Sequence, residues 1–544
     1  MKYTRGEPVH ATDAGESSMK CFHSLGSWRV RPQRRALYLA LAVFVLATGF
    51  RVAVAGAYAA SYDGYESTSR FTQGDHPPVH AMVKGDAAKY YAEAATITEQ
   101  VRAGESFLAS GERFFGPFLY PRLIAAYGLV TGTVRLDDDG AVPTGQVLGP
   151  LIAQSVLYGA ALAALFAALA TVVGTRLALV SALFLSLEPT LVQFSARLLT
   201  ETVFVSLLML AVAVALLLLR TRPPPKASPL RHWPLYALLG LLLGLMYLQR
   251  PGALGMAPIF AVAIFVNLGR RRLTALAASG ALVAAPIVAV LLLLGLHNYT
   301  RAGLFTVASP QGSYMLYEYL GAQVVAETTG VPRGDVRQRL REEALAGARG
   351  TGVVPADAVA MGDLTEAETL SLYGLYRSEA LGILSSHPLT TLGVVSYNGL
   401  VSLHLNPLGT YRRYSTIYKP EDPKLAAAQA AAYDRDWLIK IGYSALILPL
   451  AAAGWAFRRK ALPMPVNALF VLSIVYFPMV SGASGSASYR YVIPNLVFYA
   501  VYWSLAAGLL TQFVTDHAWR TVRWRRPRLP GMARTQGRGL STHR

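Results

Sequence analysis

The chain has 544 residues, of which 53% are hydrophobic and only 15% are charged, and its net charge is +19. An average soluble domain has about 25% charged residues, so this composition excludes a string of soluble domains and a disordered chain. The single cysteine, Cys21, excludes an intramolecular disulfide and a zinc or iron–sulfur site built from cysteines. A basic chain that is this apolar is expected to have a membrane, rather than a nucleic acid, as its partner.

The apolar residues are collected in runs, several of which reach the roughly 20 residues that a helix needs to cross a bilayer. The sequence therefore predicts an all-α polytopic membrane protein with about ten transmembrane helices. The pair of runs divided at Pro251-Gly252 is either two short spans or one bent hairpin. The first run is interpreted as a span rather than as a cleaved signal peptide. In chain order the runs cover residues 36–57, 147–173, 177–192, 198–219, 235–248, 252–268, 273–296, 437–457, 463–480 and 492–513.

Basic residues lie at alternate ends of these runs, before residue 36, at 270–272, at 458–460 and beyond residue 513. The positive-inside rule places all of these blocks, and both termini, in the cytoplasm. By parity, the amphipathic stretch 117–133 then lies on the outer surface. The same parity places 388–405 there, but this stretch is apolar enough to be a span, and whether it crosses the membrane stays open. The expected organisation is a cytoplasmic tail 1–35, a transmembrane core 36–296 with the first outer loop 58–146, an extracytoplasmic loop domain 297–436, transmembrane helices 437–513 and a basic cytoplasmic tail 514–544.

The same parity gathers polar side chains on the outer side of the membrane. Arginine binds phosphate through bidentate, charge-assisted hydrogen bonds, and a carboxylate beside it suits general-base catalysis on a hydroxyl or amine. We therefore expect an outward-facing cavity that suits a lipid-linked phosphate, because the lipid tail can stay in the bilayer. Its candidate residues are Lys84, Asp86, Tyr90, Arg113, Arg197, Glu201, Arg250, Asn298, Tyr299, Arg490 and Tyr491.

Structural roles remain open for three of these residues. Arg197 and Glu201 have the i,i+4 spacing of an ion pair on one helix, which stabilises without any further function. Arg250 has the alternative of extending to the lipid headgroups. Tyr90 either packs against a sugar or anchors its loop at the membrane interface.

Six short motifs follow one another between about residue 36 and residue 513. They are GDAAKYYA at 85–92, GPFLY at 116–120, EP to LTE over 188–201, GLMYLQRP at 244–251, HNYTRAGLF at 297–305 and SYRYVIP at 488–494. In content and order they resemble motifs of the GT-C superfamily of membrane glycosyltransferases. The resemblance is closest to its family 39 branch, which includes protein O-mannosyltransferases and lipid A aminoarabinose transferases.

The resemblance implies an integral membrane enzyme that transfers a hexose or pentose from a polyprenyl-phosphate donor to an extracytoplasmic lipid, glycan or protein, with inversion. It also implies that Asp86, which matches an acidic residue near the acceptor nucleophile, acts as the catalytic base. Glu201 matches a second acidic group, which orients the acceptor or the base. Arg250 and Arg490 match basic residues that hold the donor phosphate.

Two positions depart from the motifs. The lysine that often precedes the second motif is replaced by Phe115-Gly116, which makes Lys84 or Arg113 the candidate substitute, and His297 stands where arginine is usual.

Two other functions stay open, namely a multi-pass transporter or lipid-carrier flippase, and a polysaccharide polymerase or ligase.

We predict no cofactor and no resident metal, while dependence on a divalent metal stays open. The weak cluster Asp75, His76 and His80 is interrupted by Pro77-Pro78, which prevents the helix that its histidine spacing needs.

Overall fold

The computed structural model describes residues 32–62, 86–108, 110–111, 117–136, 142, 144–220, 232–268, 273–308, 310–356, 364–403, 442, 445–446, 448–456, 462–484, 490 and 492–525. Every element in this part of the chain is a helix. The first half contains α2 (Pro32–Tyr62), α3 (Asp86–Arg102), α4 (Leu119–Thr131), α5 (Thr144–Val173), α6 (Thr175–Leu187), α7 (Pro189–Ser195), α8 (Thr200–Leu219), α9 (Trp233–Gln249), η3 (Pro251–Gly255) and α10 (Met256–Leu268). The second half contains α11 (Leu273–Ala302), α12 (Pro310–Tyr314), the π-helix η4 (Met315–Gly321), α13 (Ala322–Thr329), α14 (Arg333–Gly350), α15 (Glu366–Ser386), α16 (Pro388–Ser402), α19 (Met464–Ala483) and α20 (Asn495–Arg525).

Seven helices of the described chain are long and apolar enough to cross a membrane, and the pair α6 and α7, bent by 53°, makes an eighth if it forms one span. The protein is therefore an all-α, multi-pass membrane protein, as the sequence predicts. Of the two other predicted runs, 235–248 forms α9, which has 17 residues, and 437–457 is described only in part. Lengths and composition thus support seven or eight spans, and the predicted count of about ten stays a prediction.

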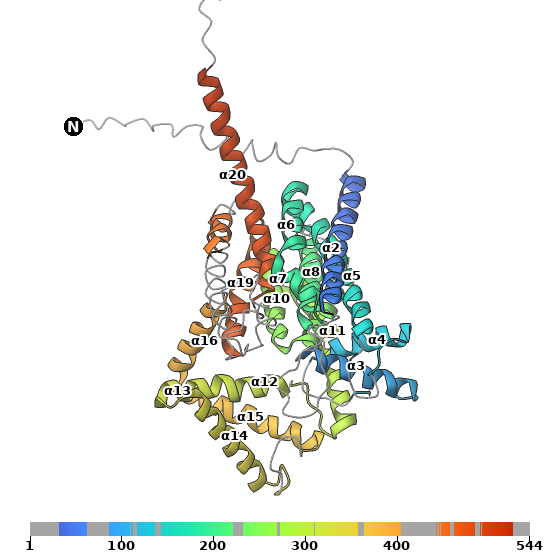
Figure 1. Cartoon of the computed structure of the whole chain (residues 1–544). Helices are drawn as coiled ribbons and strands as arrows, with labels where there is room; N and C mark the ends of the chain where they lie inside the picture. The colour runs from blue at the N-terminus through green and yellow to red at the C-terminus, as the bar shows by residue number, and fades with distance from the viewer. Residues whose placement is uncertain are drawn as a thin grey trace, which may run out of the picture.

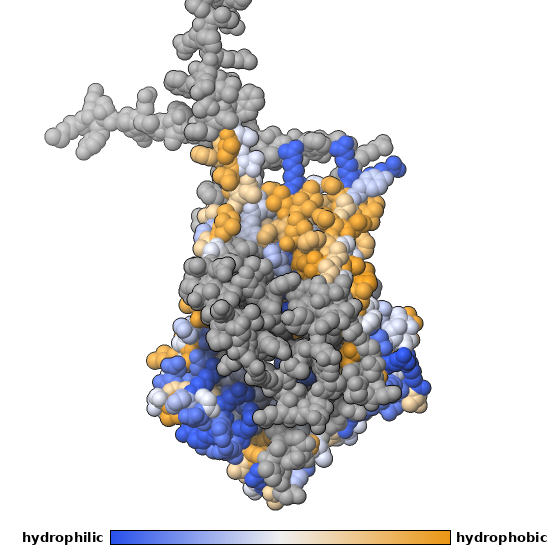
Figure 2. Space-filling model, viewed as in Figure 1, coloured by the Kyte–Doolittle hydropathy of each residue, from blue (hydrophilic) through white to orange (hydrophobic). Residues whose placement is uncertain are grey.

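Helix α8 lies at the centre of the spans, and almost all of its side chains are buried. Helices α2 and α11 lie at the periphery, where they expose large apolar side chains as lipid-facing helices do. Figure 2 shows this hydrophobic surface over the upper half of the molecule, where Figure 1 places the spans. The central position of α8 matters because its first turn carries Thr200 and Glu201.

Both described ends of the chain, the start of α2 and the end of α20, lie at the same end of the bundle (Figure 1). Helices α3 and α4 and the unit α12–α15 lie at the opposite end. The sequence predicts that 117–133 and 297–436 lie on the side of the membrane away from both termini, and this placement relative to the membrane stays a prediction.

The unit α12–α15 has an apolar core of its own, which includes Tyr317, Leu340 and Tyr376. A fully buried carboxylate, that of Glu318 on η4, connects η4 to α14. The Nε of Arg337 lies 3.1 Å from Glu318 Oε2, and the Nε of Arg341 lies 3.1 Å from Glu318 Oε1. Burial disfavours the charge of Arg337, but the hydrogen bond to Glu318 and the attraction of Tyr314, Tyr319 and Glu318 together outweigh burial and raise the pKa of Arg337. The carboxylate therefore fixes η4 against α14.

Helix α16 covers most of the stretch 388–405, whose placement on the outer surface stays a prediction. It packs antiparallel along the end of α19, close enough that a Cβ added to Gly482 would lie 2.0 Å from the carbonyl oxygen of Val395. One helical turn further, a Cβ on Gly399 would lie 2.9 Å from the carbonyl oxygen of Pro478. The glycines allow two apolar helices to approach closely, as small residues do between membrane helices.

The break between α6 and α7 is caused by Pro189, and the side chain of Arg51 binds two backbone carbonyls just before the break. Pro189 has no N–H, so the carbonyl of Leu185 loses the donor that a continuous helix would give it. Arg51, fully buried in the middle of α2, replaces that donor: its Nη2 lies 2.9 Å from the Leu185 oxygen and its Nη1 lies 2.9 Å from the Ser186 oxygen. Its Nε donates to the hydroxyl of Ser195 at 3.0 Å. One side chain thus holds both sides of the break.

Candidate functional site

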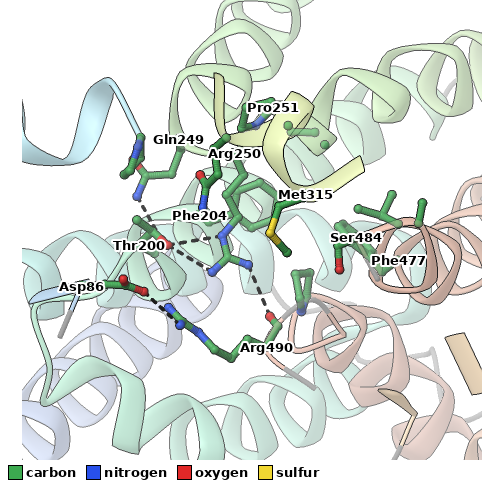
Figure 3. A pocket seen from close by; sticks show the side chains of 18 of the residues that line it. Asp86, Thr200, Phe204, Gln249, Arg250, Pro251, Met315, Phe477, Ser484 and Arg490 are labelled. Carbon is green, nitrogen blue, oxygen red and sulfur yellow. Dashed lines mark hydrogen bonds and ion pairs between the residues drawn. The ribbon is translucent and has the colours of Figure 1, made fainter. Parts of the chain in front are cut away.

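A cavity of about 550 Å³ lies where the ends of α3, α8, α9 and α19 meet α12 and η4. Figure 3 shows a polar side with Asp86, Thr200, Gln249 and Arg490, and Phe477 and Ser484 on the opposite side. The apolar part of its lining comes from both the spans and the outer helices, namely Phe204, Met315, Leu316, Phe477 and Val480. The cavity therefore joins an ionic end to an apolar end, as an amphipathic ligand requires.

Glu201 lies in the first turn of α8, a position where the helix dipole favours a carboxylate. Leu199 ahead of it is extended, so the chain enters the helix abruptly from the break after α7. The Glu201 side chain is only 2% exposed, and its Oε1 is bound by both Arg250 and Arg490. A carboxylate buried this deeply has to be paired with cations, and here two of them converge on it.

Arg250 is held outside the helices by its neighbour in sequence. Because the residue before a proline is disfavoured in the helical conformation, Arg250 is extended between α9 and the Pro251 that opens η3. Its Nη2 lies 2.8 Å from Glu201 Oε1, and its Nε and Nη2 donate to Thr200 Oγ1 at 3.3 and 3.1 Å. Its Nη1 donates to the carbonyl of Arg490 at 3.3 Å. These bonds fix the direction of the guanidinium.

Arg490 precedes α20 and connects the two acidic residues. Its Nε donates to Glu201 Oε1, and its Nη1 lies 3.3 Å from Asp86 Oδ2. Burial opposes its charge, but the attraction of Glu201 and Asp86 outweighs burial and raises the pKa of Arg490. A guanidinium has several N–H donors, so within the described part of the chain the Nη2 of Arg490 is left for a further acceptor.

Tyr90 stands one helical turn after Asp86 and packs edge-on against Tyr120, with ring centres 5.6 Å apart. Burial, together with the charges of Asp86 and Glu201, raises the pKa of the Tyr90 hydroxyl. The hydroxyl of Tyr120 donates to Gln154 at 2.9 Å, and the Gln154 amide in turn donates to the carbonyls of Ser195 and Arg197 at 2.9 and 2.8 Å. This chain of hydrogen bonds connects α4 to the segment between α7 and α8, which directly precedes the turn of α8 that carries Glu201.

The structure brings together Asp86, Tyr90, Glu201, Arg250 and Arg490 of the predicted site. Three other predicted residues do not line the cavity. Arg197 is buried before the first residue of α8, so it does not share a helix with Glu201 as the predicted i,i+4 pair requires. Asn298 donates to the carbonyl of Thr306 at 2.6 Å, and Tyr299 is 56% exposed. Lys84, Arg113 and Tyr491 lie outside the described residues, as do Asp75, His76 and His80.

Sequence reasoning missed Thr200, Gln249 and the contribution of η4. The first two were detectable, because they precede Glu201 and Arg250 directly and polar residues at the ends of apolar helices are candidates for function. Met315 and Tyr319 gave no signal, since only the packing of η4 against the spans brings them to the cavity. In the described part of the chain there is no group of three or more His, Cys, Asp or Glu that suits a metal ion.

Replacing Thr200 by Val should weaken the site without unfolding the protein. The Thr200 hydroxyl accepts two hydrogen bonds from Arg250, and valine keeps its shape but removes the acceptor. We expect roughly tenfold weaker binding of a phosphate-bearing lipid, because Arg250 loses an acceptor that fixes the direction of its guanidinium. Ligand affinity measured in detergent checks this result, with Thr200→Ser as the variant that keeps the hydroxyl. An equal loss of ligand affinity in Thr200→Val and Thr200→Ser would contradict a role for the hydroxyl.

No protein-family model matches the chain, and no curated protein is similar to it in sequence. The archaeal oligosaccharyltransferase AglB from Archaeoglobus fulgidus, solved with an inhibitory peptide and a dolichol-phosphate, is similar over 91% of this chain and 53% of its own, at 14% identity and a TM-score of 0.44. ArnT from Cupriavidus metallidurans, bound to undecaprenyl phosphate, is similar over 87% of this chain and 77% of its own, at 12% identity and a TM-score of 0.31. The chain spans about half the length of the archaeal oligosaccharyltransferases that it matches.

Proposed function

We propose that the protein is an integral membrane glycosyltransferase that moves a sugar from a polyprenyl-phosphate donor to an extracytoplasmic lipid, glycan or protein, with inversion. The observation that carries this proposal is the convergence of Arg250 and Arg490 on Glu201 beside a cavity whose other wall is apolar. The six sequence motifs support the same function, because four of the five predicted residues that meet at the site, all except Tyr90, were assigned roles from them.

The ionic end and the apolar end of the cavity together indicate the class of sugar donor that it would bind. Two guanidinium groups suit a phosphate, which accepts several charge-assisted hydrogen bonds. Phe477 and Val480 belong to α19, a candidate span, so an apolar chain attached to that phosphate passes from the cavity toward the bilayer along them. A free sugar phosphate would gain nothing from this wall, whereas a lipid-linked one would bury its chain there.

Glu201 then serves as a positioning residue for the arginines. Two guanidinium groups this close repel each other, and a buried carboxylate between them removes that repulsion. Their donors are thereby held in place before the donor lipid binds, so little reorganisation is needed when charge develops on the leaving phosphate.

In the proposed reaction Asp86 accepts the proton of the acceptor hydroxyl as its oxygen attacks the anomeric carbon from the side opposite the phosphate. The new C–O bond forms while the bond between that carbon and the phosphate oxygen breaks, which inverts the anomeric centre. The electron pair leaves on polyprenyl phosphate, whose charge Arg250 and Arg490 neutralise. Aligning the two substrates is the remaining contribution of the site.

The proposed orientation has both termini in the cytoplasm and the cavity on the extracytoplasmic side. Arg34 and Arg35 at the start of α2 and Arg176 at the start of α6 support it, because the positive-inside rule places such residues in the cytoplasm. The cavity lies at the other end of the bundle.

Transfer can be measured with the full chain in proteoliposomes that contain membrane extracts and a panel of radiolabelled polyprenyl-phosphate sugars. We expect label to move to an acceptor, and Arg250→Met to lower the rate by about 10²–10³-fold, the effect of removing one donor from a charge-stabilising site. Arg339→Met is the matched control, since Arg339 is half-exposed on α14 and pairs only with Glu343 in the described chain. Equal rates in wild type and Arg250→Met would refute the proposal, and lipid movement without sugar transfer would indicate a flippase.

A further inference from the structure

Gln249 is the last residue of α9 and lines the cavity directly beside Arg250. Its side chain is 1% exposed. The amide Nε2 donates to the carbonyl of Thr200 at 3.0 Å, whereas the amide oxygen Oε1 has no hydrogen-bond partner in the described part of the chain. Figure 3 shows Gln249 on the polar side of the cavity, next to Thr200.

An amide oxygen that is buried without a partner is costly, by about 1–3 kcal/mol. Such groups are rare in folded proteins, and each calls for a physical explanation. The bond to the Thr200 carbonyl accounts for the Nε2 half of the amide, but nothing in the described part of the chain accounts for the Oε1 half. A ligand that brings a hydrogen-bond donor to Oε1 would pair this oxygen.

We propose that Gln249 recognises the transferred sugar by accepting a hydrogen bond from the hydroxyl on the ring carbon next to the phosphate-bearing carbon. This inference rests on the proposed function, and it names a specificity determinant for the donor. The partner has to be a hydrogen-bond donor, which excludes the phosphate oxygens and the apolar chain. Sugar hydroxyls are the donors that a polyprenyl-phosphate sugar offers.

The position of Gln249 identifies the hydroxyl. Thr200 connects the two residues, since its hydroxyl binds Arg250 and its carbonyl binds Gln249. A phosphate held by Arg250 therefore places its sugar beside Gln249, and the hydroxyl closest to the phosphate is the one on the neighbouring ring carbon. On the opposite wall Phe477 and Val480 offer that hydroxyl no acceptor, and the hydroxyl of Ser484 there donates to the carbonyl of Ser481.

The test uses the full chain in detergent and measures binding of farnesyl phosphate that carries glucose, mannose, galactose, 2-deoxyglucose, 2-deoxygalactose or no sugar. For the preferred hexose, we expect wild type to bind the 2-deoxy form about tenfold more weakly, as for one lost hydrogen bond. Gln249→Met should bind both forms equally.

Gln193 provides a matched control, because it is also a buried glutamine whose amide has no partner in the described chain, but it does not line the cavity. Gln193→Met should keep the wild-type preference for the hydroxyl, and melting temperatures check that both variants fold. Equal affinity of wild type for hexose and 2-deoxyhexose, or a preference that persists in Gln249→Met, would overturn the inference. Failure of the proposed function looks different: sugar-free farnesyl phosphate would not bind, or would bind wild type and Arg250→Met equally.

Discussion

Replacing Asp86 by Asn is expected to lower sugar transfer by about 10²–10⁴-fold, the usual contribution of a general base. Asparagine has nearly the same shape as aspartate, but its amide accepts no proton at neutral pH. The substitution weakens one ion pair, that with Arg490 at 3.3 Å, and the Asp86 side chain is 49% exposed. Pairs of this kind contribute at most about 1 kcal/mol, so the fold should persist.

The measurement combines the rate of transfer from the best donor of the panel with the melting temperature of the purified protein. Asp335→Asn is the matched control, because Asp335 is an exposed aspartate in the first turn of α14, outside the cavity. Binding of sugar-free farnesyl phosphate should be retained in Asp86→Asn, since Arg250 and Glu201 are unchanged. A transfer rate equal to that of wild type would remove Asp86 from the mechanism.

Replacing Arg51 by Met should have the largest effect on stability. The substitution takes the donor from the carbonyl of Ser186 and from the hydroxyl of Ser195, and it leaves the carbonyl of Leu185 with only the hydroxyl of Tyr158. The Ser195 hydroxyl still donates to the carbonyl of Leu191, so the Ser186 carbonyl is the group left without a donor in the described chain, at a cost of about 1–3 kcal/mol, which is a sizeable part of the stability of a protein. It also removes the guanidinium that stacks on the Tyr158 ring, 3.6 Å from its centre.

The yield of monodisperse protein and its melting temperature in detergent check this prediction, and both should fall. Arg34→Met is the control, because Arg34 is an exposed arginine at the start of the same helix. Since Arg51 holds the α6–α7 break that precedes Glu201, the Arg51→Met protein that does fold should also bind farnesyl phosphate more weakly. A melting temperature equal to that of wild type would show that the break does not depend on Arg51.

Much of the fold was predictable because a membrane imposes a simple rule on the chain. Lipid cannot satisfy backbone polar groups, so the apolar runs have to be helices, and their positions follow from composition alone. The run 198–219 is found as α8, and 273–296 lies within α11. The close approach of α16 to α19 was not predictable, because it depends on glycines of two helices that meet only in the folded protein.

The site was predictable in part. Asp86, Glu201, Arg250 and Arg490 stand in short motifs at the ends of helices, and their positions along the chain indicated that they face the same side of the membrane. The motifs did not show which of them touch. That Glu201 is buried between two arginines, and is thereby a positioning group in our proposal, follows from the packing of α8 against α9 and the segment before α20.

By itself, then, the sequence determined where the helices lie, which ends carry charge and which polar residues share one side, because each of these depends on neighbours along the chain. Only the tertiary structure decided the partners of Arg51, the convergence on Glu201 and the unpaired oxygen of Gln249. These depend on contacts between segments far apart in sequence, such as Asp86 with Arg490. Such contacts are fixed by the packing of whole helices, which no local pattern records.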